Sequence, residues 1–244
     1  MSQAAAERIR SVPWGVKQAI VVFLLPWIIL PAFIILLIVI SAEYLPVLQP
    51  FVQAIDDGEP RVSLALALID AVGSFAVIRY YLRKHGVGWS ELGFRRFNPL
   101  KALLYVGGLF IAFIFVVQIL YVLVQVLVPG FNPDQEQVNE FTNIGSNFHT
   151  YALIALVVLP PFIEEPVFRG FLFPAFAKRF GLIGAAFFTS VLFGFAHLQA
   201  NVSVYTFAIG LVLCFLYVRL GSIWPGIGLH MVNNYIAFMA LSQK

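Results

Sequence analysis

Long apolar stretches alternate with short polar ones along almost the entire chain, and the charged residues gather in the short stretches. A helix needs about 20 apolar residues, at about 1.5 Å each, to cross the hydrocarbon core of a bilayer. The apolar stretches lack the two-residue alternation of transmembrane barrel strands. The pattern therefore predicts an all-α, polytopic bundle of about seven transmembrane helices. The nearly charge-free stretches are residues 18–42, 62–78, 102–133, 141–163, 180–218 (long enough for two helices around a turn at 197–203) and 220–243.

The composition agrees with this pattern and narrows the class of protein. Of the 244 residues, 61% are hydrophobic and 11% are charged, and the mean hydropathy is +0.90. A soluble domain of this length needs far more polar surface, so the composition excludes an ordinary soluble protein. We expect residues 1–244 to form a single transmembrane domain. Its expected partner is the lipid bilayer, and we expect no nucleic-acid partner. The single cysteine, Cys214, excludes an internal disulfide, and its apolar neighbours are typical of a packed thiol.

The charges between the apolar stretches alternate in sign and predict how the chain is oriented. Basic residues precede the first stretch and dominate residues 83–101, whereas residues 43–61 and 129–149 carry mostly or only acids. Basic loops stay on the cytoplasmic side of a membrane. We therefore predict a cytoplasmic N-terminus and, from the compact size, the inner (plasma) membrane of a bacterium.

One apolar stretch contains the sequence PPFIEEPVFRG at residues 160–170, which places three charges inside a predicted span. Each charge near the bilayer centre costs about 2.5–3.5 kcal/mol on insertion scales. Glu165 and Arg169 are four residues apart with the acid first, the favoured order for an ion pair on one helix face. Glu164 points about 100° away from that face and is the carboxylate without a partner. If a helix restarts after Pro161, Glu164 lies in its first turn, where the helix dipole favours an anion.

Two further polar clusters occur in later spans. The sequence FGFAH places Phe193 and His197 on one helix face, and HMVNN does the same for His230 and Asn234. Counted from the inner surface at about 1.5 Å per residue, both histidines and Glu164 reach a similar depth. These residues therefore form a candidate site. The alternative interpretation is structural, with histidines satisfied by packing and a buried ion pair at a helix kink.

The three clusters together resemble one known family. Glu-Glu-x-x-x-Arg at 164–169, Phe-x-x-x-His at 193–197 and His-x-x-x-Asn at 230–234 are similar to motifs of the CAAX-processing and bacteriocin-processing (CPBP) family of intramembrane endopeptidases. That family includes the prenyl-protein endopeptidase, which removes the last three residues of prenylated proteins. The likeness covers about residues 150–244, which we expect to be the catalytic core.

The resemblance implies an endopeptidase that requires no cofactor. Glu164 would be the general base that activates water, with assistance from His197, and His230 and Asn234 would form the oxyanion hole. The side chains implied to support the site are Glu165, Arg169 and Phe193. The implied substrate is a peptide or a protein, lipidated or bound to the membrane.

The motifs of other types of intramembrane protease are missing or incomplete in the sequence. The sequence contains no His-Glu-x-x-His zinc motif and no Gly-x-Ser-x-Gly nucleophile turn. Asp70 is the only aspartate inside a predicted span, so an aspartyl dyad lacks its second carboxylate. Zinc held by Glu164, His197 and His230 stays an alternative, although their spacing matches no strong zinc motif and metal-free hydrolysis is favoured. Two non-proteolytic alternatives also stay open: a non-catalytic family member in bacteriocin immunity or acting as a membrane scaffold, and ion or solute transport through Asp70.

Overall fold

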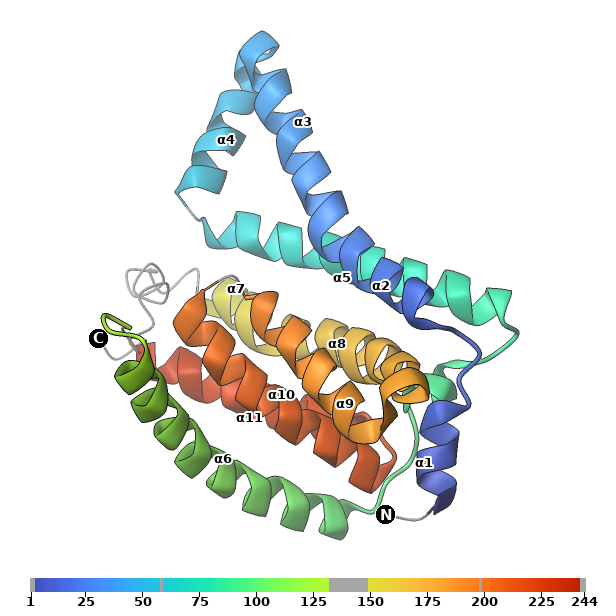
Figure 1. Ribbon diagram of the computed structural model, residues 1–244. Helices are drawn as coiled ribbons and strands as arrows, with labels where there is room; N and C mark the ends of the chain where they lie inside the picture. Colours follow the sequence, from blue (N-terminus) through green and yellow to red (C-terminus); the bar gives the residue numbers. More distant parts are fainter. Residues whose placement is uncertain (1–2, 58, 132–148, 198, 242–244) are drawn as a thin grey trace.

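The computed structural model describes residues 3–57, 59–131, 149–197 and 199–241, and in these ranges the chain is helical without a β-strand (Figure 1). The predicted all-α class is confirmed. The α-helices are α1 (Gln3–Arg10), α2 (Val16–Leu24), α3 (Leu30–Tyr44), α4 (Gln49–Asp56), α5 (Pro60–Lys84), α6 (Pro99–Leu127), α7 (His149–Leu153), α8 (Leu159–Glu165), α9 (Phe173–Phe195), α10 (Ala200–Leu220) and α11 (Trp224–Leu241). Short 3-10 or π segments are η1 (Leu25–Ile29), η2 (Pro46–Leu48), η3 (Trp89–Leu92), η5 (Ile154–Val158) and η6 (Pro166–Leu172).

Five helical segments among the described residues are long and apolar enough to cross a membrane. They are Val16–Tyr44, Leu64–Lys84, Pro99–Leu127, Thr150–Phe195 and Asn201–Leu220. The expected count of about seven is not confirmed. One reason is that Thr150–Phe195 is a single segment of 46 residues, in which Gly181, at φ 70° and ψ 177°, interrupts the helix. Another is that α11, which forms in the last predicted stretch, is not among the five.

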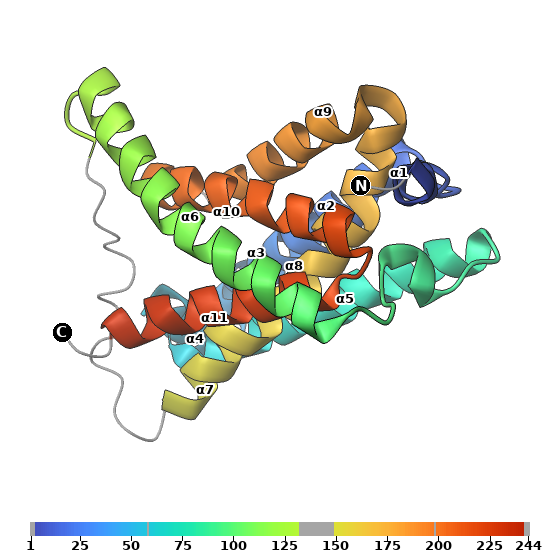
Figure 2. The same ribbon diagram turned by 90° about the horizontal axis from the view of Figure 1, so that it is seen from below.

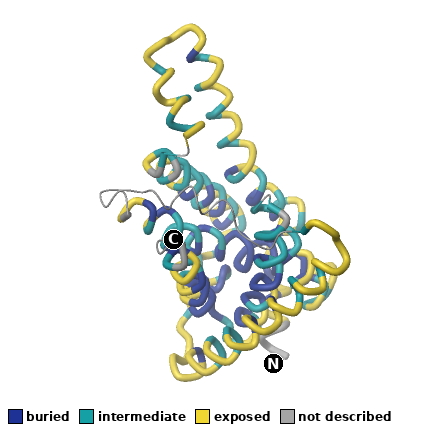
Figure 3. Tube along the Cα trace, turned by 90° about the vertical axis from the view of Figure 1, so that its left-hand side faces the viewer, coloured by how far each residue is buried: buried dark blue, intermediate teal, exposed yellow. Residues whose placement is uncertain are grey.

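The C-terminal half of the chain forms the centre of the molecule. Helices α8, α9, α10 and α11 pack together, and α6 runs along one side of this group against α10 and α11 (Figures 1 and 2). Helices α2 and α5 lie on another side, while α3 and α4 extend away from the bundle (Figure 1). Buried residues concentrate in the centre, and the outlying helices expose apolar side chains (Figure 3). This distribution is expected of a bundle whose outer surface faces lipid.

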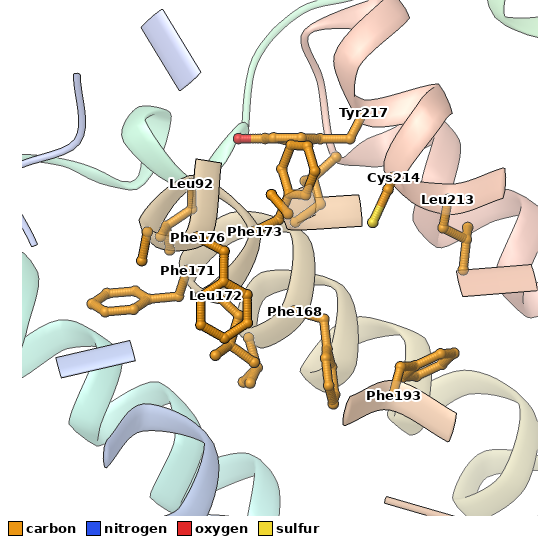
Figure 4. Packing of buried hydrophobic residues seen from close by; sticks show 14 of the residues in the cluster. Leu92, Phe168, Phe171, Leu172, Phe173, Phe176, Phe193, Leu213, Cys214 and Tyr217 are labelled. Carbon is orange, nitrogen blue, oxygen red and sulfur yellow. The ribbon is translucent and has the colours of Figure 1, made fainter. Parts of the chain in front are cut away.

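Aromatic side chains fill the space around η6, next to the glutamates. Phe168 packs edge-on against Phe193 with ring centroids 4.9 Å apart (Figure 4). Phe171 stacks on Trp14 at 4.3 Å, and Trp14 Nε1 donates a hydrogen bond of 3.0 Å to the Phe171 carbonyl oxygen. These contacts fix the N-terminal segment and α9 to the helix that carries the charged sequence.

The connection between α5 and α6 packs closely against the same helix. A Cβ atom on Gly170 would lie 3.0 Å from both the Cβ and the carbonyl oxygen of Leu92, so a larger residue would push this connection back by a few tenths of an ångström. The connection is also tied to the start of α11, because Ile223 N donates to the Gly93 carbonyl oxygen at 2.8 Å. The glycine of the Phe-Arg-Gly sequence thus joins the cytoplasmic connection predicted at 83–101 to the centre of the bundle.

The prolines around the glutamates do not break the helix. Residues 149–172 stay helical because two π-helical segments, η5 and η6, flank α8 and change the hydrogen-bond partners where proline donors are missing. Pro160 and Pro161 lie at the start of α8 and Glu164 near its end. The expected first-turn position of Glu164 is therefore wrong, since no free helix start exists at Pro161.

Candidate active site

The expected ion pair between Glu165 and Arg169 is present and fully buried. Arg169 Nη1 lies 2.9 Å from Glu165 Oε1, and the two side chains are 0% and 1% exposed. Arg169 Nη2 also donates to the Gly210 carbonyl oxygen at 3.3 Å, and the guanidinium lies 4.4 Å from the Phe193 ring centroid. The pair therefore joins η6 and α8 to α9 and α10.

His230 on α11 lies between the two glutamates. Its Nδ1 is 3.1 Å from Glu165 Oε1, and its Nε2 is 3.6 Å from Glu164 Oε2. Glu165 pairs with Arg169 and can only accept a hydrogen bond, so His230 Nδ1 carries a proton and donates it. Nε2 is left facing Glu164. One imidazole thus brings the first sequence cluster and the third together.

Glu164 differs from its neighbour in its surroundings. Its side chain is 12% exposed, compared with 1% for Glu165. Within the described residues, its Oε2 is a buried oxygen without a hydrogen-bond partner, as is Glu165 Oε2, but neither Glu164 oxygen pairs with Arg169 there. A carboxylate in this state, close to an imidazole and outside the arginine pair, is suited to accept a proton.

His197 lies two residues after Phe195, the last residue of α9, in the turn that follows the helix. Its Nδ1 is 2.8 Å from the Phe193 carbonyl oxygen, so Nδ1 donates and Nε2 is left with its lone pair. The Phe193 ring lies against both imidazoles, with centroid distances of 5.2 Å to His197 and 5.6 Å to His230. Phe193 therefore packs against both histidines and connects the two clusters that carry them.

Asn234 lies one helical turn after His230 and contacts the helix that carries the glutamates. Its Nδ2 donates to the Leu156 carbonyl oxygen in η5 at 3.1 Å, and its Oδ1 is 3.4 Å from Asn233 Nδ2. Tyr205 of α10 donates a hydrogen bond to Asn233 Oδ1. The structure thus connects Glu164, Glu165, Arg169, Phe193 and His230 by direct contacts, and brings His197 and Asn234 to them through Phe193 and α11.

Sequence reasoning missed Tyr205 and Asn233. Asn233 is the first asparagine of HMVNN, but only its neighbour Asn234 has the family spacing from His230. Tyr205 gave no signal, because a tyrosine near the start of an apolar helix is common and its partner is 28 residues away. Asp70 is not connected to the cluster by a hydrogen bond or ion pair within the described part of the chain, where its Oδ1 is a buried oxygen without a hydrogen-bond partner.

The alternative metal set does not come together. Among the residues that the structure describes, no three histidine, cysteine, aspartate or glutamate side chains are arranged to hold one metal ion. Glu164, His197 and His230 therefore do not fit a zinc site of three protein ligands in this arrangement.

These helices and their buried charges define an integral membrane protein with a polar cluster inside an apolar bundle. Residues 146–236 match the family model described as type II CAAX prenyl endopeptidase Rce1-like, so the resemblance to the CAAX-processing family is confirmed for this part of the chain. The Bacillus subtilis (strain 168) protein named "Putative membrane peptidase YdiL" is 31% identical over 90 residues, which are 36% of this chain and 37% of that protein. The match thus spans little more than a third of the relative's length. No solved structure matches the chain.

Proposed function

We propose that the chain is an intramembrane endopeptidase that hydrolyses a peptide bond with a water molecule activated by Glu164. The observation that carries the proposal is the placement of His230 against both glutamates of the Glu-Glu-x-x-x-Arg sequence. The match of residues 146–236 to an endopeptidase family supports the same reaction class. The proposed setting is the inner membrane of a bacterium with the N-terminus in the cytoplasm.

The proposed reaction is a direct attack by water. Glu164 accepts a proton from the water molecule, with assistance from His197, while the water oxygen bonds to the scissile carbonyl carbon. The carbon–nitrogen bond then breaks, and the proton held by Glu164 passes to the leaving amine. No covalent intermediate with the protein forms, and no metal or other cofactor takes part.

His230 and Asn234 would stabilise the oxyanion of the tetrahedral intermediate. His230 donates from Nε2 when the ring carries both protons, and the two glutamates beside it compensate that charge. Asn234 donates the Nδ2 proton that is not used by Leu156. Removal of one donor of this kind lowers the rate about 10²–10³-fold. Glu165 and Arg169 would hold His230 and Phe193 in place without contacting substrate.

The proposed substrate is a membrane-bound peptide or protein, with a prenylated C-terminal peptide as the first choice because of the matched family. A suitable probe is an internally quenched peptide with a farnesylated cysteine followed by three residues, incubated with purified protein in detergent. We expect Glu164→Gln to lower cleavage at least about a hundredfold, because the amide cannot accept the water proton. Its thermal unfolding temperature should stay close to that of the wild type, since Arg169 pairs with Glu165 and not with Glu164 among the residues that the structure describes.

The matched control is Glu43→Gln, the same chemical change at an exposed acid near the end of α3. This variant should cleave at the wild-type rate. Equal cleavage by wild type and Glu164→Gln would remove the proposed base. Absence of cleavage in all three proteins would favour a non-catalytic role of the same fold, as an immunity protein or scaffold.

A further inference from the structure

The side-chain amide of Asn234 is held at both of its ends. Nδ2 donates to the Leu156 carbonyl oxygen, and Oδ1 faces Asn233 Nδ2 at 3.4 Å. An asparagine amide has two N–H donors, so one Nδ2 proton is left for another acceptor. A reversed amide would place Asn234 Oδ1 against the Leu156 carbonyl oxygen, and two acceptors repel each other. The surroundings therefore select one orientation of the amide.

The first end is fixed by the proline pair. In a helix the Leu156 carbonyl oxygen accepts from residue 160, and in a π-helical segment it accepts from residue 161. Both positions are prolines and carry no backbone N–H. The orphaned carbonyl oxygen would be costly to leave without a donor inside the membrane, and Asn234 supplies the donor. The sequence Pro160–Pro161 thus creates the acceptor that orients Asn234.

The second end is fixed by Tyr205. Its hydroxyl donates to Asn233 Oδ1, which turns Asn233 Nδ2 toward Asn234. The Tyr205 ring is itself held by an edge-on contact with Phe113 of α6 at 5.0 Å. Asn233 is 6% exposed, so water does not compete freely for its amide. A chain of hydrogen bonds therefore runs from α10 through Asn233 to Asn234.

We infer that Tyr205, acting through Asn233, is a positioning residue that presents the free N–H of Asn234 to the substrate oxyanion. The inference rests on the proposed endopeptidase function, in which Asn234 is an oxyanion donor. Tyr205 itself does not touch the substrate. Loss of its hydroxyl frees Asn233 to turn, and Asn234 then loses the neighbour that fixes its Oδ1. A donor displaced by about 1 Å loses much of its effect on the transition state.

The kinetic test is Tyr205→Phe, measured with the farnesylated quenched peptide. We expect kcat to fall about 10–100-fold while KM stays within about twofold, because the donor acts on the transition state and not on substrate binding. The matched control is Tyr217→Phe. Tyr217 lies near the other end of the same helix, where its ring packs edge-on against Phe173 with centroids 6.0 Å apart. The control should retain wild-type kcat and KM.

A double-mutant cycle tests the route through Asn233. Asn233→Ala should lower kcat to a similar extent, and Tyr205→Phe should have no further effect in that background. Additive losses in the double variant would mean that Tyr205 acts elsewhere and would overturn the inference.

A measurement independent of activity separates this inference from the proposed function. In protein labelled with ¹⁵N-asparagine, the side-chain amide signals of Asn234, assigned with Asn234→Asp, should shift in Tyr205→Phe and stay in place in Tyr217→Phe. Unchanged Asn234 signals in Tyr205→Phe would overturn the inference even in an active enzyme. Shifted signals in a protein that cleaves nothing would support the hydrogen-bond chain and refute only the endopeptidase function.

Discussion

The Glu165–Arg169 pair is the most deeply buried charge in the site, and its cost explains its connections. An ion pair in an apolar interior is tolerated only when its remaining donors and acceptors are satisfied. Arg169 uses the Gly210 carbonyl oxygen and the Phe193 ring, and Glu165 uses His230. Within the described residues, Glu165 Oε2 and Arg169 Nε are buried without a hydrogen-bond partner, so the pair is only partly satisfied. The pair is therefore a junction at which side chains of three helices meet.

Removal of one partner of this pair should destabilise the protein strongly. We expect Arg169→Ala to lower the free energy of unfolding by about 3–5 kcal/mol, because Glu165 is left as an uncompensated buried charge. Reversible denaturation in mixed micelles measures this change. Arg96→Ala, at an exposed arginine of the α5–α6 connection, is the control and should change stability by less than about 0.5 kcal/mol. Similar unfolding free energies for the two variants would contradict the structural role of the pair.

At this scale the sequence predicted contacts within one helix better than contacts between helices. The four-residue spacing of Glu165 and Arg169 predicted their ion pair, because helix geometry alone brings such residues together. Helix geometry does not tell how α11 is rotated against α8. The sequence therefore did not predict that His230 contacts Glu165 through Nδ1 and Glu164 through Nε2.

At the scale of helical elements, the continuity of residues 149–172 is the main departure from expectation. The sequence allowed a helix restart after Pro161 or a kink at the glutamates, but missing proline donors can be compensated by a break, a π segment or a side chain from elsewhere. Two of these solutions occur together, since η5 and η6 flank α8 and Asn234 bonds to Leu156. The second solution depends on a residue 78 positions away and could not be read from the local sequence.

The close approach of η3 to η6 makes Gly170 a sensitive position. We expect Gly170→Ala to destabilise the protein by about 1–3 kcal/mol, because the new Cβ would meet Leu92 at 3.0 Å, including its backbone. Gly107→Ala is the control, since a Cβ there has nothing within 4 Å. It should be neutral or stabilise α6 by up to about 1 kcal/mol. Thermal unfolding of both variants in the same detergent compares them, and a Gly170→Ala protein as stable as the wild type would contradict the tight contact.

On the scale of the whole molecule, the part that holds the site is also the part that matches known proteins. Residues 146–236 include η5, α8, η6, α9, α10 and most of α11, which pack together in the centre. The remainder, including α3 and α4, exposes apolar side chains and lies outside the match (Figure 3). Hydropathy predicted the membrane class and the helical fold because long apolar stretches are a strong signal. It did not fix the number of spans, since one helical segment joins two predicted stretches.

The arrangement of the site also leads to a prediction about metals. We expect exhaustive chelation with 1,10-phenanthroline and EDTA to leave cleavage of the farnesylated peptide unchanged, because Glu164, His197 and His230 do not form a three-ligand site. The assay compares chelated and untreated protein, with a zinc peptidase of known sensitivity as the control. Loss of activity that added zinc restores would refute metal-free catalysis.

The central claim is that Glu164 activates a water molecule that attacks the peptide bond directly. Its most direct test is a single turnover in H₂¹⁸O, followed by mass spectrometry of both the peptide product and the intact protein. The account predicts one ¹⁸O atom in the new carboxylate for wild type and Glu43→Gln, no peptide adduct on the protein, and almost no product for Glu164→Gln. A covalent peptide–protein adduct, or labelled product from Glu164→Gln at the wild-type rate, would contradict it.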